Sequence, residues 1–193
     1  MTTRSRLPSD VPEPRPHLGE PPALDLLNTR WIAQTGPQDL LTDVAGARQW
    51  LADNNLDAPA DEDTLNALLA AREAILRVVK ADSADDPHIA DGLNAVLAHG
   101  RIRRALTPDG PAGVPEVADP AWLPAWLAAD NLLHLLANSP ERIKQCAHPH
   151  CVLWFLDTSK NGTRRWHSMA ACGNRAKATR HYAKKTQSEQ SAG

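Results

Sequence analysis

Hydrophobic residues recur with a helical period along most of the chain up to residue 139. The clearest run extends from Leu65 to Val79, behind Asp61 or Asp63, either of which would cap the helix. The same period predicts further helices over residues 24–35, 42–54, 87–99 and 122–137. We therefore expect a mainly α-helical domain over residues 23–139.

Other stretches of the chain depart from this period. Residues 101–117 alternate at both ends around a Pro-Asp-Gly turn, which predicts a short β-hairpin. The prolines in its second strand would confine that strand to an edge. Residues 1–22 are rich in proline and mixed in charge, which is typical of a flexible arm. Residues 187–193 are predicted to be a disordered tail.

Tryptophans recur on the predicted helices, at Trp31, Trp50, Trp122 and Trp126. Their spacing is that of buried helix faces, so core packing is the simpler interpretation. The alternative is an aromatic ligand pocket, to which Asn28, Trp31 and Trp126 would contribute. The sequence leaves both interpretations open.

The three cysteines of the chain lie close together near the C-terminus, at Cys146, Cys151 and Cys172. His167 precedes the last of them by five residues. Two close pairs separated by a longer insert suit a tetrahedral zinc site with four protein ligands, and such a closed site is structural. The sequence therefore predicts one structural Zn²⁺. Buried cysteines without metal are the alternative, and His148 or His150 would compete with His167 as the fourth ligand.

The segment around these ligands predicts a small module over residues 140–186. Residues 152–156 resemble a strand, 158–162 a reversing turn, and 164–167 a return strand. Ser168 stands at an N-cap position, followed by a predicted helix over 169–185 whose first turn carries Cys172. A knuckle, a hairpin and a helix in this order form a treble-clef-like zinc finger.

The net charge of −2 conceals a division between the two parts of the chain. Residues 1–139 hold 11 Lys and Arg against 20 Asp and Glu, whereas residues 140–186 hold 10 against 2. Such asymmetry favours a polyanionic partner for the basic part. It would equally allow the acidic part to dock on the basic part.

The basic residues fall mainly on the last predicted helix. Lys177, Arg180 and Lys184 share one helix face with His181, a pattern suited to phosphate contacts. Asn and Arg side chains can read base edges. The candidate DNA-binding residues are therefore Arg164, Arg165, Asn174, Arg175, Lys177, Arg180 and Lys184. A solvated helix face is the alternative interpretation.

Motifs for catalysis and for export are missing from the sequence. It has no glycine-rich phosphate loop, no Gly-x-Ser-x-Gly elbow and no His-Glu-x-x-His pair, so we expect no enzymatic activity. It has no apolar run long enough to span a membrane and no signal-peptide centre. We expect a cytoplasmic protein, in which reduced cysteines favour metal over disulfides.

The C-terminal segment resembles the CGNR-type zinc finger. The resemblance rests on Trp166-His-Ser-Met, the Cys172-Gly-Asn-Arg motif, the Phe155-x-Asp157-x-Ser159 run and the two earlier cysteines. The stretch Leu24-Asp-Leu-Leu-Asn-Thr resembles the opening of the ABATE domain. The family commonly has cysteine where this chain has His167, and zinc accepts either ligand.

The resemblance implies a bacterial transcription regulator. Together with the basic charge of residues 140–186, it leads to the hypothesis of a regulator that binds DNA through the finger and senses a small molecule or protein through its helical domain. The alternative function is a metabolite-binding protein or enzyme in which the zinc module is structural or docks another protein. The sequence specifies neither the effector nor the oligomeric state.

Overall fold

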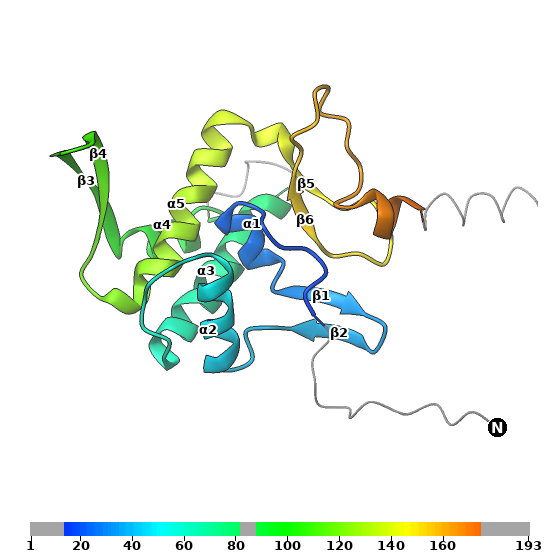
Figure 1. Cartoon of the computed structure of the whole chain (residues 1–193), viewed down its shortest axis with the longest axis horizontal. Helices are drawn as coiled ribbons and strands as arrows, with labels where there is room; N and C mark the ends of the chain where they lie inside the picture. The colour runs from blue at the N-terminus through cyan, green and yellow to red at the C-terminus, as the bar shows by residue number, and fades with distance from the viewer. Residues whose placement is uncertain (1–13, 82–87, 175–193) are drawn as a thin grey trace, which may run out of the picture.

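The computed structural model describes residues 14–81 and 88–174. Its helices pack around α3, which contacts α1, α2, α4 and α5, and the buried core includes Leu24, Trp50, Leu68, Ile75 and Leu132. Figure 1 shows a two-stranded ribbon at one side of this bundle and the cysteine-containing module at the other. The helices are α1 (Pro22–Leu27), α2 (Val44–Asp53), α3 (Glu62–Lys80), α4 (Asp91–Leu97) and α5 (Leu123–Asn138).

The predicted caps and breaks account for most of these helices. Asp61 caps α3, because its Oδ1 accepts a hydrogen bond from the Thr64 amide at 2.9 Å. The predictions for α2, α3 and α5 are confirmed, whereas α4 is shorter than expected and begins at Asp91. The predicted break at residues 82–87 lies outside the described residues. None of the helices in the described ranges has the length and hydropathy needed to cross a bilayer.

The predicted hairpin forms the ribbon that projects from the bundle (Figure 1). Strand β3 (Gly100–Thr107) pairs antiparallel with β4 (Gly110–Val117). Gly110 has a φ of +111°, a conformation that glycine adopts without the steric cost of a side chain. This prediction is confirmed.

The first predicted helix is wrong beyond residue 27. The chain leaves α1 and forms β1 (Arg30–Ala33) and β2 (Gly36–Asp39), an antiparallel hairpin. Thr29 helps to end the helix, because its hydroxyl donates to the Leu26 carbonyl at 2.7 Å. Gly36 at φ +119° then allows the tight reversal between the strands.

The cysteine-containing module also differs from its predicted hairpin. After the short turn η2 (Pro140–Arg142), strand β5 (Ile143–Gln145) pairs with β6 (Trp154–Leu156), so the knuckle itself connects the strands. Residues 164–167 form no strand, and contact the knuckle through a hydrogen bond from the Ala147 amide to the Arg165 carbonyl at 2.8 Å. The correction arises because backbone pairing continues from β5 into the knuckle, where the Cys146 amide donates to the Leu153 carbonyl.

The predicted last helix begins with a helical turn, η3 (Met169–Gly173). Ser168 caps it as expected, with its hydroxyl accepting from the Ala171 amide at 3.2 Å. The rest of the predicted helix and the predicted tail lie outside the described residues. The protein thus combines a mainly α-helical domain with a small knuckle–hairpin–helix finger.

Residues 15–20, here called the N-terminal strap, were expected to belong to a flexible arm, but they lie against the folded domain. Arg15 pairs with Asp25 at 2.8 Å and with Asp53 at 2.9 Å. Its side chain is only 4% exposed. This buried pairing fixes the described part of the expected arm, whereas residues 1–13 lie outside the described ranges.

Candidate metal centre and the joint with the helical domain

Four predicted ligands converge in the finger. One ligand atom from each of Cys146, Cys151, His167 and Cys172 lies within 4.8 Å of the other three. The Cys151 Sγ is 3.5 Å from the His167 Nδ1. A tetrahedral zinc with bonds of about 2.3 Å to sulfur and about 2.0 Å to nitrogen would separate these two atoms by about 3.5 Å. Three thiols and one imidazole in this arrangement fit structural zinc and leave no open position for substrate.

Local backbone structure brings the ligands together. Cys146 follows β5 directly, and the Cys151 amide donates to the His148 carbonyl at 3.0 Å, which closes the knuckle. His167 immediately precedes the Ser168 cap, and the Cys172 amide bonds to the Ser168 carbonyl. The cap therefore fixes the spacing between the last two ligands.

The competing histidines lie outside the ligand cluster. His148 is buried, and its Nδ1 accepts a hydrogen bond from the His150 amide at 3.2 Å. Its ring therefore stabilises the turn of the knuckle. The geometry favours His167 over His148 and His150 as the fourth ligand.

The thiols are crowded in a partly buried space. Burial, reinforced by the charges that Cys146 and Cys172 would carry as thiolates, raises the pKa of the Cys151 thiol to about 12. Three thiolates this close repel one another unless a cation lies between them. A divalent metal would supply that charge and displace the protons.

Zinc binding at pH 7 is therefore expected to release about three protons, one from each thiol. Because protons compete with the metal, the zinc affinity should fall as the pH is lowered from 7 to 6. Calorimetric titration in two buffers with different ionisation enthalpies measures the proton count. A release of fewer than two protons would contradict a site with three thiolate ligands.

Asp157 organises the loop beside the metal ligands. Its buried carboxylate accepts hydrogen bonds from the Lys144 ammonium at 2.7 Å, from the Ser159 hydroxyl at 2.6 Å and from the Arg164 amide at 2.9 Å. The bonds from Lys144 and Ser159 hold the pKa of this carboxyl well below its usual range. The Phe155-x-Asp157-x-Ser159 run is thus a structural motif in which Lys144 supplies the positive partner.

Much of the positive charge in the described part of the finger is used internally. The Arg164 Nε donates to the Trp166 carbonyl at 2.9 Å, and its guanidinium also bonds to the His167 carbonyl and lies over the Phe155 ring. Arg142 donates to two loop carbonyls at 2.7 and 2.8 Å. Arg164 therefore orients the segment that carries a zinc ligand, a role that sequence reasoning missed when it proposed a DNA contact.

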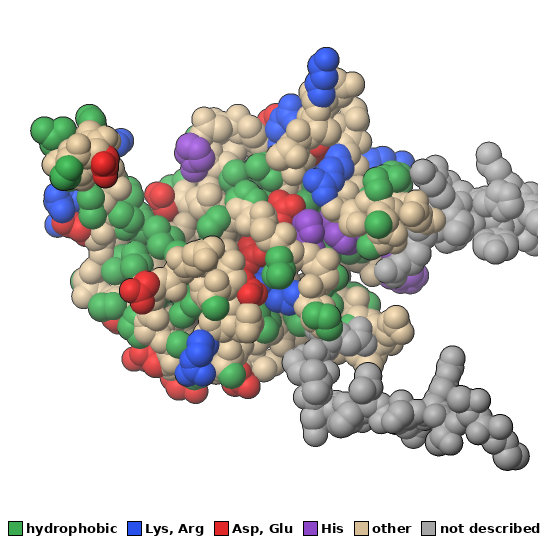
Figure 2. Space-filling view, in the orientation of Figure 1, with side chains coloured by type: hydrophobic (Ala, Val, Ile, Leu, Met, Phe, Trp, Pro, Cys, Tyr) green, Lys and Arg blue, Asp and Glu red, His purple; other side chains and the backbone are tan. Residues whose placement is uncertain are grey.

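The other proposed DNA contacts lie at the surface or beyond the described residues. Arg165 is exposed, with its guanidinium 5.3 Å from the centre of the Trp166 ring, and Asn174 is exposed at the end of η3. On the face shown in Figure 2, Lys and Arg side chains gather over the finger, whereas Asp and Glu lie along the edge formed by α2 and α3. Arg175, Lys177, Arg180 and Lys184 lie outside the described residues.

A buried polar joint connects the finger to the helical domain. The Asn28 side chain is fully buried, donates to the Trp154 carbonyl at 2.9 Å and accepts from the Trp154 amide at 2.8 Å. Asn28 thus completes the free edge of β6. Sequence reasoning missed this role, although an asparagine inside an apolar run was a signal that a buried partner existed.

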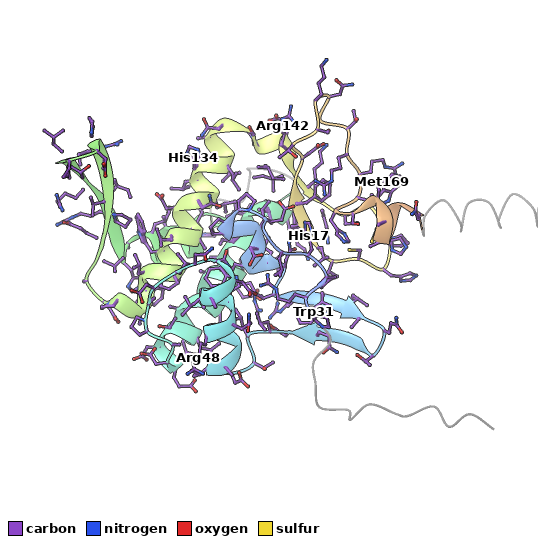
Figure 3. All side chains as sticks on the ribbon, in the orientation of Figure 1. His17, Trp31, Arg48, His134, Arg142 and Met169 are labelled. Atoms are coloured by element: carbon purple, nitrogen blue, oxygen red, sulfur yellow. The ribbon has the colours of Figure 1, made fainter. Side chains whose placement is uncertain are left out.

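The N-terminal strap extends this joint to the metal site. Glu20 Oε2 accepts a hydrogen bond from the Leu156 amide at 2.8 Å, and its other carboxylate oxygen lies 2.7 Å from the His17 Nε2. The His17 ring centre is 5.1 Å from that of His167, and Figure 3 shows His17 between α1 and the finger. The strap therefore covers one zinc ligand from outside the finger.

Comparison with known families agrees with this architecture. Residues 20–139 match the ABATE model, described as "Putative stress-induced transcription regulator". The chain belongs to the ABATE family. Residues 142–185 match the CGNR zinc finger. No curated protein matches the chain.

The CGNR finger of this ABATE protein contains the site of one structural zinc ion, held by the cluster described above. Zinc ligation there would fix the knuckle, the Asp157 loop and η3 relative to one another, since all three carry or contact ligands. The metal is a folding element of the finger, because its four protein ligands complete a tetrahedron.

The tryptophans of the ABATE domain have different environments. Trp50 is fully buried in the core, and the Trp126 indole donates to the Leu97 carbonyl at 3.0 Å. Trp122 stacks on His99, with ring centres 3.5 Å apart. Trp31, labelled on β1 in Figure 3, lines a cavity of about 410 Å³ whose walls come from the ABATE domain and the finger. Among the three predicted pocket residues, Trp31 therefore lines this cavity, while Asn28 and Trp126 serve structure.

Proposed function

We propose that this ABATE protein is a transcription regulator with a helical sensor domain over residues 23–139 and a DNA-binding CGNR finger over residues 140–186. The observation that carries the proposal is the charge division, since the finger region holds 10 Lys and Arg against 2 Asp and Glu. DNA is the polyanion that a regulator of this family description would contact.

The internal roles of Arg142, Lys144 and Arg164 sharpen the proposal. These three side chains hold the finger together, so they are excluded from the proposed DNA surface. The proposed contacts are then Arg165, Asn174 and the basic residues that follow: Arg175, Lys177, Arg180 and Lys184. The zinc ion would position this surface without taking part in chemistry.

Binding of the zinc-loaded full chain to random duplex DNA tests the proposal. Replacing Arg180 and Lys184 with alanine should weaken binding to all sequences, because each lost phosphate contact removes about 0.9 from the slope of log affinity against log salt. Fluorescence anisotropy at several salt concentrations measures both quantities. Replacing Arg48 and Arg77 of the helical domain is the charge-matched control and should leave the slope unchanged.

If the full chain does not bind DNA at low salt, the proposal still allows one explanation. The acidic helical domain would then mask the finger, and residues 140–186 alone should bind DNA. If neither the full chain nor the finger binds at low salt, the regulator function is wrong. The finger would then be a structural or protein-docking module of a metabolite-binding protein.

A further inference from the structure

A cavity at the joint combines walls from three elements. The β1–β2 hairpin contributes Trp31 and Asp39, α3 contributes Arg72 and Lys80, and the finger contributes Trp154. Its volume of about 410 Å³ falls within the range of small-molecule sites, roughly 300–1,000 Å³. Because the finger forms one wall, an occupant would contact both parts of the protein at once.

The charged groups of the cavity leave an excess of positive charge. Arg72 is 1% exposed and binds the Asp39 carboxylate with two hydrogen bonds, of 2.6 and 2.9 Å. Arg30 shares the same carboxylate at 3.0 Å and also pairs with Glu73 at the surface. Burial alone would raise the pKa of Asp39, but the bonds from Arg72 and Arg30 outweigh it and lower that pKa. The carboxylate is therefore charged at neutral pH and is already occupied by two guanidinium groups.

One positive group of the cavity remains available to a ligand. Lys80 is exposed and makes no ion pair with any described residue. The Arg72 guanidinium already donates to Asp39 and Thr29, and its Nε is buried where a ligand in the cavity does not reach it. The positive excess at Lys80 therefore favours an anionic ligand.

The rest of the lining is apolar. Leu27, Leu76 and Trp154 contribute hydrocarbon and aromatic surface. Ile32 and Val152, from the hairpin and the finger, are 45% and 39% exposed and also line the cavity. Burying such side chains under an apolar ligand stabilises the complex by about 25 cal/mol per Å² of apolar surface removed from water.

We propose that this cavity binds a small organic anion with a flat apolar body, such as an aromatic carboxylate, and that the ligand fastens the finger to the helical domain. This inference rests on the proposed function, for which it supplies the effector site. The fastening follows from Val152, which is adjacent to the ligand Cys151, and from Trp154, which Asn28 holds on both backbone groups. A ligand packed on these residues resists movement of the knuckle away from α3.

Binding of model anions to the zinc-loaded full chain tests the inference. The probes are the flat anions benzoate and 1-naphthoate, with the flexible decanoate as the shape control and 1-naphthalenemethanol as the neutral control. Isothermal titration calorimetry measures each affinity. At least one of the two flat anions should bind saturably and more tightly than decanoate. If it is 1-naphthoate, it should bind at least about fivefold more tightly than the alcohol, the effect of one favourable charge contact.

Two pairs of variants locate the site. Lys80→Glu should weaken anion binding about five- to tenfold, whereas Arg77→Glu, with the same charge change on the same helix but outside the cavity lining, should not. Ile32→Glu should also weaken binding. Leu133→Glu is its control, because Leu133 is 43% exposed and lies outside the lining. The inference is wrong if neither benzoate nor 1-naphthoate binds, or if both cavity variants bind the anion as the wild type does.

The fastening is measured separately, as the rate of zinc loss to a chelator with and without saturating anion. The rate should fall at least about threefold, because exposure of the knuckle limits zinc release and the anion restricts it. An unchanged rate would overturn the fastening. Since none of these measurements uses DNA, a protein that binds the anion but no DNA refutes the proposed function alone, and the converse result refutes this inference alone.

Discussion

Cys172→Ser should abolish stoichiometric zinc binding and unfold the CGNR finger. The thiolate is one of four ligands, and structural zinc sites supply about 10–16 kcal/mol of apparent binding energy that also serves as folding energy. A serine hydroxyl is a poor substitute because it stays protonated at neutral pH. Zinc content after gel filtration and the circular dichroism spectrum measure the two effects.

The helical domain provides an internal reference for this variant. Its core contains Trp154 as a buried contribution from the finger, so its melting temperature should fall while most helical signal persists. Ala170→Ser adds a serine to the same turn at an exposed position and should retain zinc. Native zinc content and spectrum in Cys172→Ser would show that this cysteine is not a ligand.

Asn28→Ala should destabilise the protein by about 2–6 kcal/mol. Removing the Asn28 side chain leaves the backbone N–H and C=O of Trp154 without a partner. Each unsatisfied buried group costs about 1–3 kcal/mol. Urea denaturation of the zinc-loaded protein measures the change. Zinc loss to a chelator should also accelerate, because β6 would be less firmly held against α1.

The matched control for this substitution is Asn138→Ala. Asn138 ends α5 and donates to the His134 carbonyl at an exposed site, where water can replace the bond. Its loss should change stability by less than about 0.5 kcal/mol. A cost below 1 kcal/mol for Asn28→Ala would mean that the joint contributes little to coupling the two parts.

The sequence was sufficient to predict elements whose local signals agree. In α3, the Asp61 cap and the apolar period point to the same helix, and in β3–β4 the turn and the alternation coincide. The zinc ligands were predictable for the same reason, because their spacing along the chain reflects one local module. Each of these features depends on residues close in sequence.

The mispredicted elements had conflicting local signals. Trp31 continues the helical spacing of Leu24 and Leu27, yet it lies on the strand β1. Its burial does not distinguish the two, because a strand can bury this side chain as a helix would. The pairing of β6 was wrong because β5 has three residues, too few for a clear period. The strong turn signal at residues 158–162 favoured residues 164–167 as the partner of this strand, in place of β5.

The joint could not be predicted because its partners are distant in sequence. Asn28 and Trp154 are 126 positions apart, and Glu20 and Leu156 are 136 apart. No periodicity or motif specifies such a pair. An asparagine in an apolar run indicates that a buried partner exists, but only the folded structure identifies that partner.

This separation along the chain has a consequence for folding during synthesis. The N-terminal strap and α1 leave the ribosome first, but the backbone groups that satisfy Glu20 and Asn28 follow after more than a hundred residues. At 5–20 residues per second, Trp154 is made roughly 6–25 s after Asn28. Glu20 and Asn28, which flank the first helix, therefore stay without these backbone partners while the bundle assembles, and the finger supplies them when it packs against the helical domain.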